Sequence, residues 1–115
     1  MKKISGQGQT GQQNYGGKFM SVVYIAGPIT EVKCYQRNFA AAEWRLSEDG
    51  HVVFNPAMMP VGLEHEKYMP ICYAMLDACD TIYFLIGWQK SKGACMEYEY
   101  ALSRKMDMLF EEEGR

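Results

Sequence analysis

Residues 21–28 read SVVYIAGP, and this stretch decides how the rest of the chain is interpreted. Valine, isoleucine and tyrosine favour extended backbone. A continuous apolar run that is closed by a glycine–proline pair is typical of a strand buried on both faces of a parallel sheet. The stretch TIYFLI at residues 81–86 repeats this pattern more strongly and is followed by a polar loop at residues 87–92. Both stretches are therefore predicted to be buried strands.

Helical patterns alternate with strands along the rest of the chain. A first helix carries Tyr35, Phe39, Ala42 and Leu46 at helical spacing and ends at Gly50, a residue that favours a helix terminus. The other predicted elements are a strand at residues 51–54, a loop at residues 57–66, a helix carrying Tyr68 to Cys79, a helix over residues 94–105 and a last strand at residues 106–110. Pro70 fits the second helix only in its first turn, because proline has no N–H to donate at a later position.

This alternation predicts one α/β domain. Four strands and three helices in this order form a three-layer, Rossmann/flavodoxin-like domain with a short parallel sheet of about four strands and helices on both faces. In such domains, ligands bind beyond the carboxyl ends of the strands, near the point where the strand order reverses. Residues 26–30, 55–56 and 87–93 follow three of the predicted strands, so candidate functional residues are sought there.

Composition limits the classes of function. With 115 residues, 48% of them hydrophobic and 23% charged, the chain has room for one domain. A net charge of −2 argues against a broad basic surface for nucleic acid or membrane, and no apolar run approaches 18 residues. The four cysteines form no C-x-x-C pair and no secretory signal precedes them, so we expect a reduced, cytoplasmic protein with no metal site and no cofactor.

The first 19 residues differ from the rest. They are rich in glycine, glutamine and asparagine and contain no acidic residue. Such a segment buries too little apolar surface to offset its ordering entropy, so residues 1–19 are predicted to be a flexible leader and residues 20–115 the folded domain. A domain this small buries only about 65% of the surface that its unfolded chain exposes, which favours a homo-oligomer, a dimer or larger.

Two strand exits have features that suit an anionic ligand. Gly27 lets the backbone approach a ligand closely, although a tight turn alone also explains it. Ser91 is a candidate N-cap for the last helix, with Gly93 beside it, and free N–H groups at a helix start suit a phosphate or carboxylate. Trp88 could contact a base or sugar, or cover the edge of the core.

Glu97 is the strongest candidate for chemistry. It shares a helical face with Ala94 and Ala101, and a face of such small residues suggests close packing against the sheet. A carboxylate there costs stability unless it is paired or used, whereas Glu99 is expected to point into solvent. A solvated Glu97 is the alternative.

Several of these motifs, taken in order, resemble the DUF4406 group of the nucleoside 2-deoxyribosyltransferase-like superfamily. The resemblance covers roughly residues 20–111 and rests on the segments YIAGPIT (residues 24–30), FNP (54–56), CDTI (79–82), GW (87–88), SKGA (91–94) and Glu97. It implies an enzyme that cleaves or exchanges the N-glycosidic bond of a deoxynucleoside or of its 5′-monophosphate.

The resemblance also implies roles for individual residues. Glu97, with Gly93 four residues before it, matches the glutamate that attacks C1′ and forms a covalent deoxyribosyl intermediate. Donors around Glu97 are expected to lower its pKa and hold it ionised. The substrate-binding residues implied by the matched segments are Tyr24, Gly27, Pro28, Ile29, Thr30, Asn55, Trp88, Ser91 and Gly93, with phosphate near Gly27, Ile29, Thr30, Ser91 and Gly93.

One position departs from the pattern. The superfamily usually has an aspartate eight residues before the aspartate of the third strand, and counting back from Asp80 leads to Cys72. Asp77 lies about a turn and a half from Cys72 and is expected to face elsewhere. Three interpretations therefore stay open: an N-glycoside-cleaving enzyme acting on a small nucleoside or nucleotide, a nucleotide-binding module with weak or no catalysis, and a structural homo-oligomeric domain. For the enzyme, Glu97 should share a pocket with Gly27 and Ser91, with Cys72 at its wall.

Overall fold

The computed structural model describes residues 2–4, 12–13 and 19–113 of the chain. Its elements, in chain order, are β1 (Lys2–Ile4), β2 (Gln12–Gln13), β3 (Phe19–Met20), β4 (Val22–Ala26), α1 (Tyr35–Glu48), β5 (Val52–Phe54), the 3-10 helix η2 (Pro56–Met58), α2 (His65–Asp77), β6 (Thr81–Phe84), the 3-10 helix η3 (Trp88–Lys90), α3 (Lys92–Ser103) and β7 (Asp107–Phe110). Within the described residues, no helix is both long and apolar enough to cross a bilayer.

The main sheet has the strand order β1-β7-β6-β4-β5. β5, β4, β6 and β7 are parallel to one another, which confirms the predicted parallel sheet of four strands. The chain adds β5 on one side of β4 and then β6 and β7 on the other, so the strand order reverses at β4. The carboxyl end of β4 is therefore the position where a domain of this class binds its ligand.

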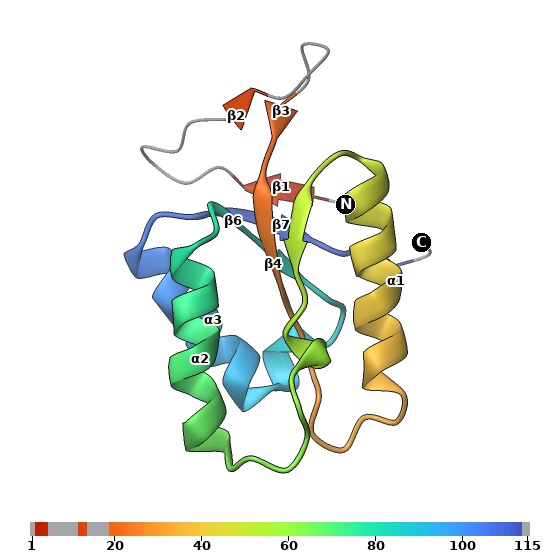
Figure 1. Ribbon diagram of the computed structural model, residues 1–115, viewed down its shortest axis with the longest axis vertical. Coiled ribbons are helices and arrows are strands. Elements are labelled where there is room, and N and C mark those ends of the chain that lie inside the picture. The colour runs from red at the N-terminus through yellow and green to blue at the C-terminus, as the bar shows by residue number, and fades with distance from the viewer. Residues whose placement is uncertain (1, 5–11, 14–18, 114–115) are drawn as a thin grey trace.

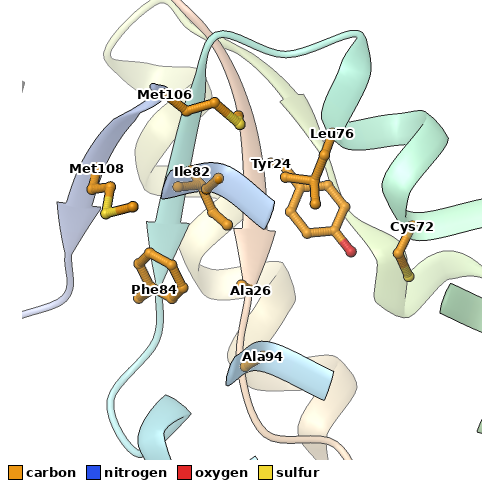
Figure 2. Close-up of a cluster of buried hydrophobic side chains, with 10 residues drawn as sticks. Tyr24, Ala26, Cys72, Leu76, Ile82, Phe84, Ala94, Met106 and Met108 are labelled. Atoms are coloured by element: carbon orange, nitrogen blue, oxygen red, sulfur yellow. The ribbon is translucent and has the colours of Figure 1, made fainter. Parts of the chain in front are cut away.

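Helices cover both faces of the sheet, so the domain has three layers. Figure 1 shows α1 on one side of the strands and α2 with α3 on the other. The α1 side buries Val23 and Ile25 of β4 against Phe39, Ala42 and Leu46. On the α2–α3 side, Figure 2 shows a second cluster around Tyr24, Ile82 and Leu76. Each fully buried aliphatic side chain in these clusters contributes about 1.5–3 kcal/mol to folding.

The predicted leader falls largely outside the described residues. Its described pieces are three short strands, of which β2 and β3 pair with each other. β1 pairs antiparallel with β7, with Lys2 opposite Phe110 and Ile4 opposite Met108. The parallel sheet thus gains an antiparallel strand at its β7 edge, which the composition of the first residues did not indicate.

The second helix begins earlier than predicted. α2 starts at His65, with Glu64 in extended backbone before it, so Pro70 stands in the second turn and the prediction of a first-turn proline was wrong. Proline at this position leaves the carbonyl of Glu66 without its helical partner. Both Glu66 and Pro70 are exposed, so water can satisfy that carbonyl and the helix continues.

Candidate functional site

A cavity of about 220 Å³ opens beyond the carboxyl end of β4. Its wall combines β4 and the loop after it, the segment after β5, and residues of α1, α2 and α3. The lining residues are Tyr24, Ile25, Gly27, Ile29, Thr30, Tyr35, Phe39, Pro56, Ala57, Met59, Pro60, Leu63, His65, Tyr68, Met69, Cys72, Ser91, Gly93, Ala94 and Glu97. This is the position that the sheet topology predicts for a ligand.

Glu97 is buried at the inner wall of this cavity. Its side chain is 6% exposed and lies on the buried face of α3 together with Ala94 and Ala101, as the small-residue spacing predicted. The hydroxyl of Tyr24, a fully buried residue of β4, donates a hydrogen bond of 2.5 Å to Glu97 Oε2. The carboxyl is thus held toward the cavity and away from bulk water.

The protonation of Glu97 differs from the expected one. Burial raises the pKa of Glu97 from 4.5 to about 7, and the hydrogen bonds with Tyr24 and Cys72 lower it by less than burial raises it. The prediction that donors would hold the pKa below its usual value was therefore wrong, because desolvation outweighs them. A carboxyl with a pKa near 7 exchanges its proton readily at neutral pH.

Cys72 and Tyr24 stand next to this carboxyl and keep their protons. Cys72 is 6% exposed, and burial raises the pKa of its thiol to about 11. Burial, followed by the charge of Glu97, raises the pKa of Tyr24 well above its ordinary value. Figure 2 shows the Tyr24 hydroxyl directed toward Cys72 of α2.

The start of α3 forms another part of the wall. Ser91 is the N-cap of α3, and its Oγ accepts a hydrogen bond of 3.1 Å from the N–H of Ala94. Gly93 lies against His65 of α2, because a Cβ on Gly93 would be 3.5 Å from His65 Cε1. The first turn of α3 and the first residue of α2 therefore meet at the cavity.

The packing of the segment after β6 explains why position 27 is a glycine. A Cβ at this position would lie 2.7 Å from Cδ1 of Leu85, closer than real Cβ contacts allow. Leu85 is buried and its N–H bonds the carbonyl of Ala26 at 2.8 Å, so the leucine cannot move aside easily. The absence of a side chain at Gly27 is thus required by the close approach of the segment after β6, a packing reason that differs from the tight turn considered from the sequence.

The structure brings most of the sequence-predicted site residues together. Those that line the cavity are Tyr24, Gly27, Ile29, Thr30, Ser91, Gly93 and Glu97, with Cys72 at the wall. Pro28, Asn55 and Trp88 are not among the lining residues.

Asn55 and Trp88 have structural partners elsewhere. Asn55 Oδ1 accepts from the N–H of Ala57 at 2.9 Å and caps η2, while Asn55 Nδ2 donates to Glu43 at 2.9 Å. Trp88 stacks on Tyr98 with ring centroids 5.0 Å apart and contacts Phe84 at 4.6 Å, covering the edge of the core.

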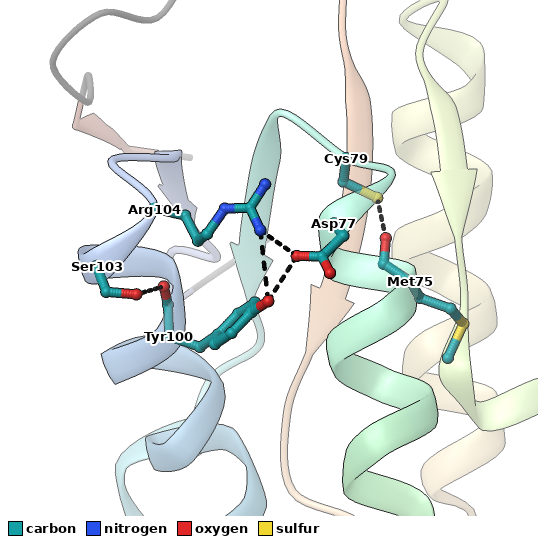
Figure 3. A network of polar contacts seen from close by, with 6 residues as sticks. All are labelled: Met75, Asp77, Cys79, Tyr100, Ser103 and Arg104. Carbon is teal, nitrogen blue, oxygen red and sulfur yellow. Dashed lines mark hydrogen bonds and ion pairs between the residues drawn. The ribbon is translucent and has the colours of Figure 1, made fainter.

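Asp77, the next acid along α2, faces away from the cavity. Its carboxylate accepts a hydrogen bond of 2.6 Å from the Tyr100 hydroxyl and forms an ion pair with Arg104 on the outer side of α2 and α3 (Figure 3). This confirms the expectation from helical spacing. Within the described part of the chain, no group of three acidic, histidine or cysteine side chains is arranged to hold a metal ion.

Sequence reasoning predicted Cys72 at the wall of the pocket but missed the other residues that α2 contributes to the cavity. His65, Tyr68, Met69 and Cys72 all line it, and their spacings of three, four and seven residues place them on one helical face. That spacing was present in the sequence, but a helix start placed near Tyr68 hid the first member. The Tyr68 hydroxyl donates to the carbonyl of Pro60 at 2.5 Å and so ties the loop before α2 to the helix.

Comparison with known proteins gives one family. Residues 21–110 match the family described as Domain of unknown function (DUF4406). No curated protein and no solved structure matches the chain. The match spans more than half of the chain and includes every residue singled out in the cavity, so the chain belongs to the DUF4406 family.

Proposed function

We propose that this protein cleaves the N-glycosidic bond of a small nucleoside or nucleotide, with Glu97 as the nucleophile that attacks C1′ and with water or a second base as the acceptor of the sugar. The proposal is supported by the buried carboxyl of Glu97, which faces a small cavity at the topological switch point of the sheet. It is also supported by the resemblance of the motifs around Glu97 to the nucleoside 2-deoxyribosyltransferase-like superfamily.

The environment of Glu97 suits this chemistry. The transition state of glycoside cleavage has oxocarbenium character, so an adjacent carboxylate stabilises it and then forms a bond to C1′. The hydrogen bond from Tyr24 fixes Oε2 of Glu97 and so orients the carboxyl at the wall of the cavity. A pKa of about 7, raised by burial, means that the reactive carboxylate is gained as the pH rises through neutrality.

The start of α3 suits the sugar-phosphate end of a nucleotide. Ser91 and Gly93 line the cavity where the first turn of α3 presents its N–H groups, which attract phosphate. Gly93 precedes Glu97 by four residues, or about 6 Å along the helix axis. A phosphate held at this end would orient the sugar so that C1′ faces Glu97.

The alternative function is nucleotide binding with weak or no cleavage. Cys72 favours it, because this thiol stands where the resembled enzymes have an aspartate and burial raises its pKa to about 11. A purely structural role is less well supported, because such a role does not require a buried carboxyl at the wall of a cavity.

The test is a panel of nucleosides, deoxynucleosides and their 5′-monophosphates, followed by chromatography of the free base. Wild-type protein should release base from at least one member, and Glu97→Gln should reduce kcat/KM by about 1,000-fold or more, because it removes the nucleophile. Glu99→Gln is the matched control: it makes the same chemical change two residues away on the exposed side of α3 and should leave the rate unchanged.

The same panel distinguishes the alternative. If no member is cleaved but a monophosphate raises the melting temperature of the wild type, the protein is a binding module. Base release that survives Glu97→Gln would remove Glu97 from the mechanism.

A further inference from the structure

We propose that the cavity selects N-glycosides whose base carries a positive charge, such as an N7-alkylated purine or a pyridinium nucleoside. This inference rests on the proposed function and specifies its substrate class. It follows from two features of the cavity wall: the charge that Glu97 brings into it, and the groups that stand beside Glu97 where a leaving base would need a proton.

The charge of the cavity favours a cation. Glu97 is the one acidic residue among the described residues that line it, and none of those residues is a lysine or arginine. The partners of Glu97 are the neutral hydroxyl of Tyr24 and the neutral thiol of Cys72. An ionised carboxylate that is buried beside neutral groups lacks a compensating charge, and a cationic ring in the cavity would supply it.

The leaving base is the second consideration. A neutral base departs with the bonding electron pair as an anion unless an acid protonates it, whereas a cationic base departs as a neutral molecule. General acid catalysis at such a step is commonly worth ~10²–10⁴-fold. The identity of the group next to the base therefore decides which substrates react.

The groups beside Glu97 are poor acids. Burial raises the pKa of Cys72 to about 11 and that of Tyr24 well above its ordinary value. The Tyr68 hydroxyl already donates its proton to the carbonyl of Pro60.

His65 stands at another part of the wall. It lies beside Gly93, at the end of the cavity proposed for the phosphate, and Gly93 is about 6 Å from Glu97 along the axis of α3. The wall next to Glu97 thus suits a base that needs no proton.

The reaction balances without a further reactant. Glu97 forms a bond from a carboxylate oxygen to C1′ as the C1′–N bond breaks, and the electron pair of that bond neutralises the cationic base. Water then attacks the glycosyl ester, releases the sugar and restores the carboxylate, and the remaining proton passes to solvent.

The first experiment compares 7-methylguanosine with guanosine, each in ribo and deoxy form and as nucleoside and 5′-monophosphate. The two bases have nearly the same shape and differ in charge. We expect kcat/KM for the cationic member to exceed that for the neutral one by about 100-fold or more. We expect base release from the cationic member to be lost in Glu97→Gln.

A change at Cys72 separates the effect of the protein from the intrinsic lability of the cationic substrate. In Cys72→Asp, two neighbouring carboxyls share the site and one of them holds a proton, which can serve as an acid. This variant should raise the ratio of kcat/KM for guanosine to kcat/KM for 7-methylguanosine at least about tenfold, because an effect on the Glu97 nucleophile is common to both substrates and cancels in the ratio. Cys72→Ser, which adds no acid, is the matched control and should not raise this ratio.

A binding measurement needs neither turnover nor a change at Cys72. 1-Methylnicotinamide, methylated at the ring nitrogen, is a pyridinium cation without a glycosidic bond, and nicotinamide is its neutral counterpart. By calorimetry at pH 8, the cation should bind wild-type protein at least about tenfold more tightly, through its attraction to the Glu97 carboxylate. The preference should disappear in Glu97→Gln.

The outcomes are distinguishable. Comparable cleavage of guanosine and 7-methylguanosine, each dependent on Glu97, would overturn the charge selectivity and leave the proposed function intact. Failure of Cys72→Asp, once folded, to raise the ratio of guanosine to 7-methylguanosine cleavage, or equal affinity of the wild type for nicotinamide and its methylated cation, would also overturn it. Absence of cleavage of every substrate would overturn the proposed function and this inference together.

Discussion

β4 presents two different environments from one buried strand. On one side, Val23 and Ile25 pack against the apolar side chains of α1. On the other side, Tyr24 is equally buried, but its hydroxyl bonds the carboxyl of Glu97 and lies near Cys72. Burial of polar groups lowers stability, so folding alone does not explain the buried carboxyl on the α2–α3 side. The comparison therefore favours the α2–α3 side of β4 for the chemistry that we propose for Glu97.

The largest effect is expected on the α1 side. Leu46 is 1% exposed and does not line the cavity, so Leu46→Ala should lower the free energy of unfolding by about 2–5 kcal/mol. Urea denaturation measures this loss. Ligand affinity, measured well below the melting temperature, should be unchanged. A large loss of affinity in folded Leu46→Ala protein would mean that the α1 side of β4 contributes to ligand binding as well as to stability.

On the α2–α3 side, the burial of Glu97 should make the free energy of unfolding depend on pH. The folded-state pKa of Glu97, about 7, lies above the value of 4.5 expected when unfolded, so folding favours the protonated form. The raised pKa therefore contributes to the free energy of unfolding. This contribution is fully present below pH 4.5 and is lost as the pH rises through 7, by about 3 kcal/mol in total. Denaturation of wild type and Glu97→Gln between pH 4.5 and 8.5 should show this difference, with Gln relatively more stable at high pH. A difference that does not change with pH would contradict the burial of an ionisable Glu97.

Tyr24 should control the protonation of Glu97. Tyr24→Phe keeps the ring in the core but removes a donor that lowers the pKa of the carboxyl. Loss of a hydrogen bond to a charged group, worth about 1.5–3 kcal/mol, should raise the pKa of Glu97 by ~1–2 units. The acidic limb of the kcat/KM profile should then move to higher pH. An unmoved limb would show that another group governs it.

The smallest effect is expected for a change at Asn55, which lies outside the cavity. Asn55→Ala removes the cap of η2 and the bond to Glu43, and should cost about 1 kcal/mol of stability. Because Asn55 lies outside the cavity lining, kcat/KM should stay at the wild-type value. If Asn55→Ala lost activity without losing stability, this prediction would be wrong. Asn55 would then belong to the substrate site, as its position after the second predicted strand suggested.

The sequence was sufficient to predict the parallel strands of the sheet and the burial of Glu97. The strand patterns of residues 21–26 and 81–86 correspond to β4 and β6, because continuous apolar runs have few other places in a fold. The spacing of Ala94, Glu97 and Ala101 predicted a buried carboxyl, because the periodicity of a helix depends on the local sequence and decides which side chains share a face.

Other features depended on contacts between distant segments. Asn55 and Trp88 both follow strands, but the geometry of η2 and the aromatic cluster around Phe84 turn them toward structural partners. The pKa of Glu97 depends on how much water the assembled domain excludes, which residue identities alone do not give. To predict the residues that α2 contributes to the cavity, the first residue of that helix had to be known. Helix ends are the part of a helix that the sequence indicates least well.

The contact between Gly27 and Leu85 affects how mutational screens of this family should be read. In a selection that depends on the proposed activity, replacement of Gly27 and replacement of Glu97 would both appear as loss of function. The first would act by lowering the amount of folded protein, because a methyl group collides with an immobile neighbour. The second would leave abundance intact or increased at neutral pH and above. Only a screen that scores cellular abundance beside activity would separate a position needed for assembly of the domain from one needed for its chemistry.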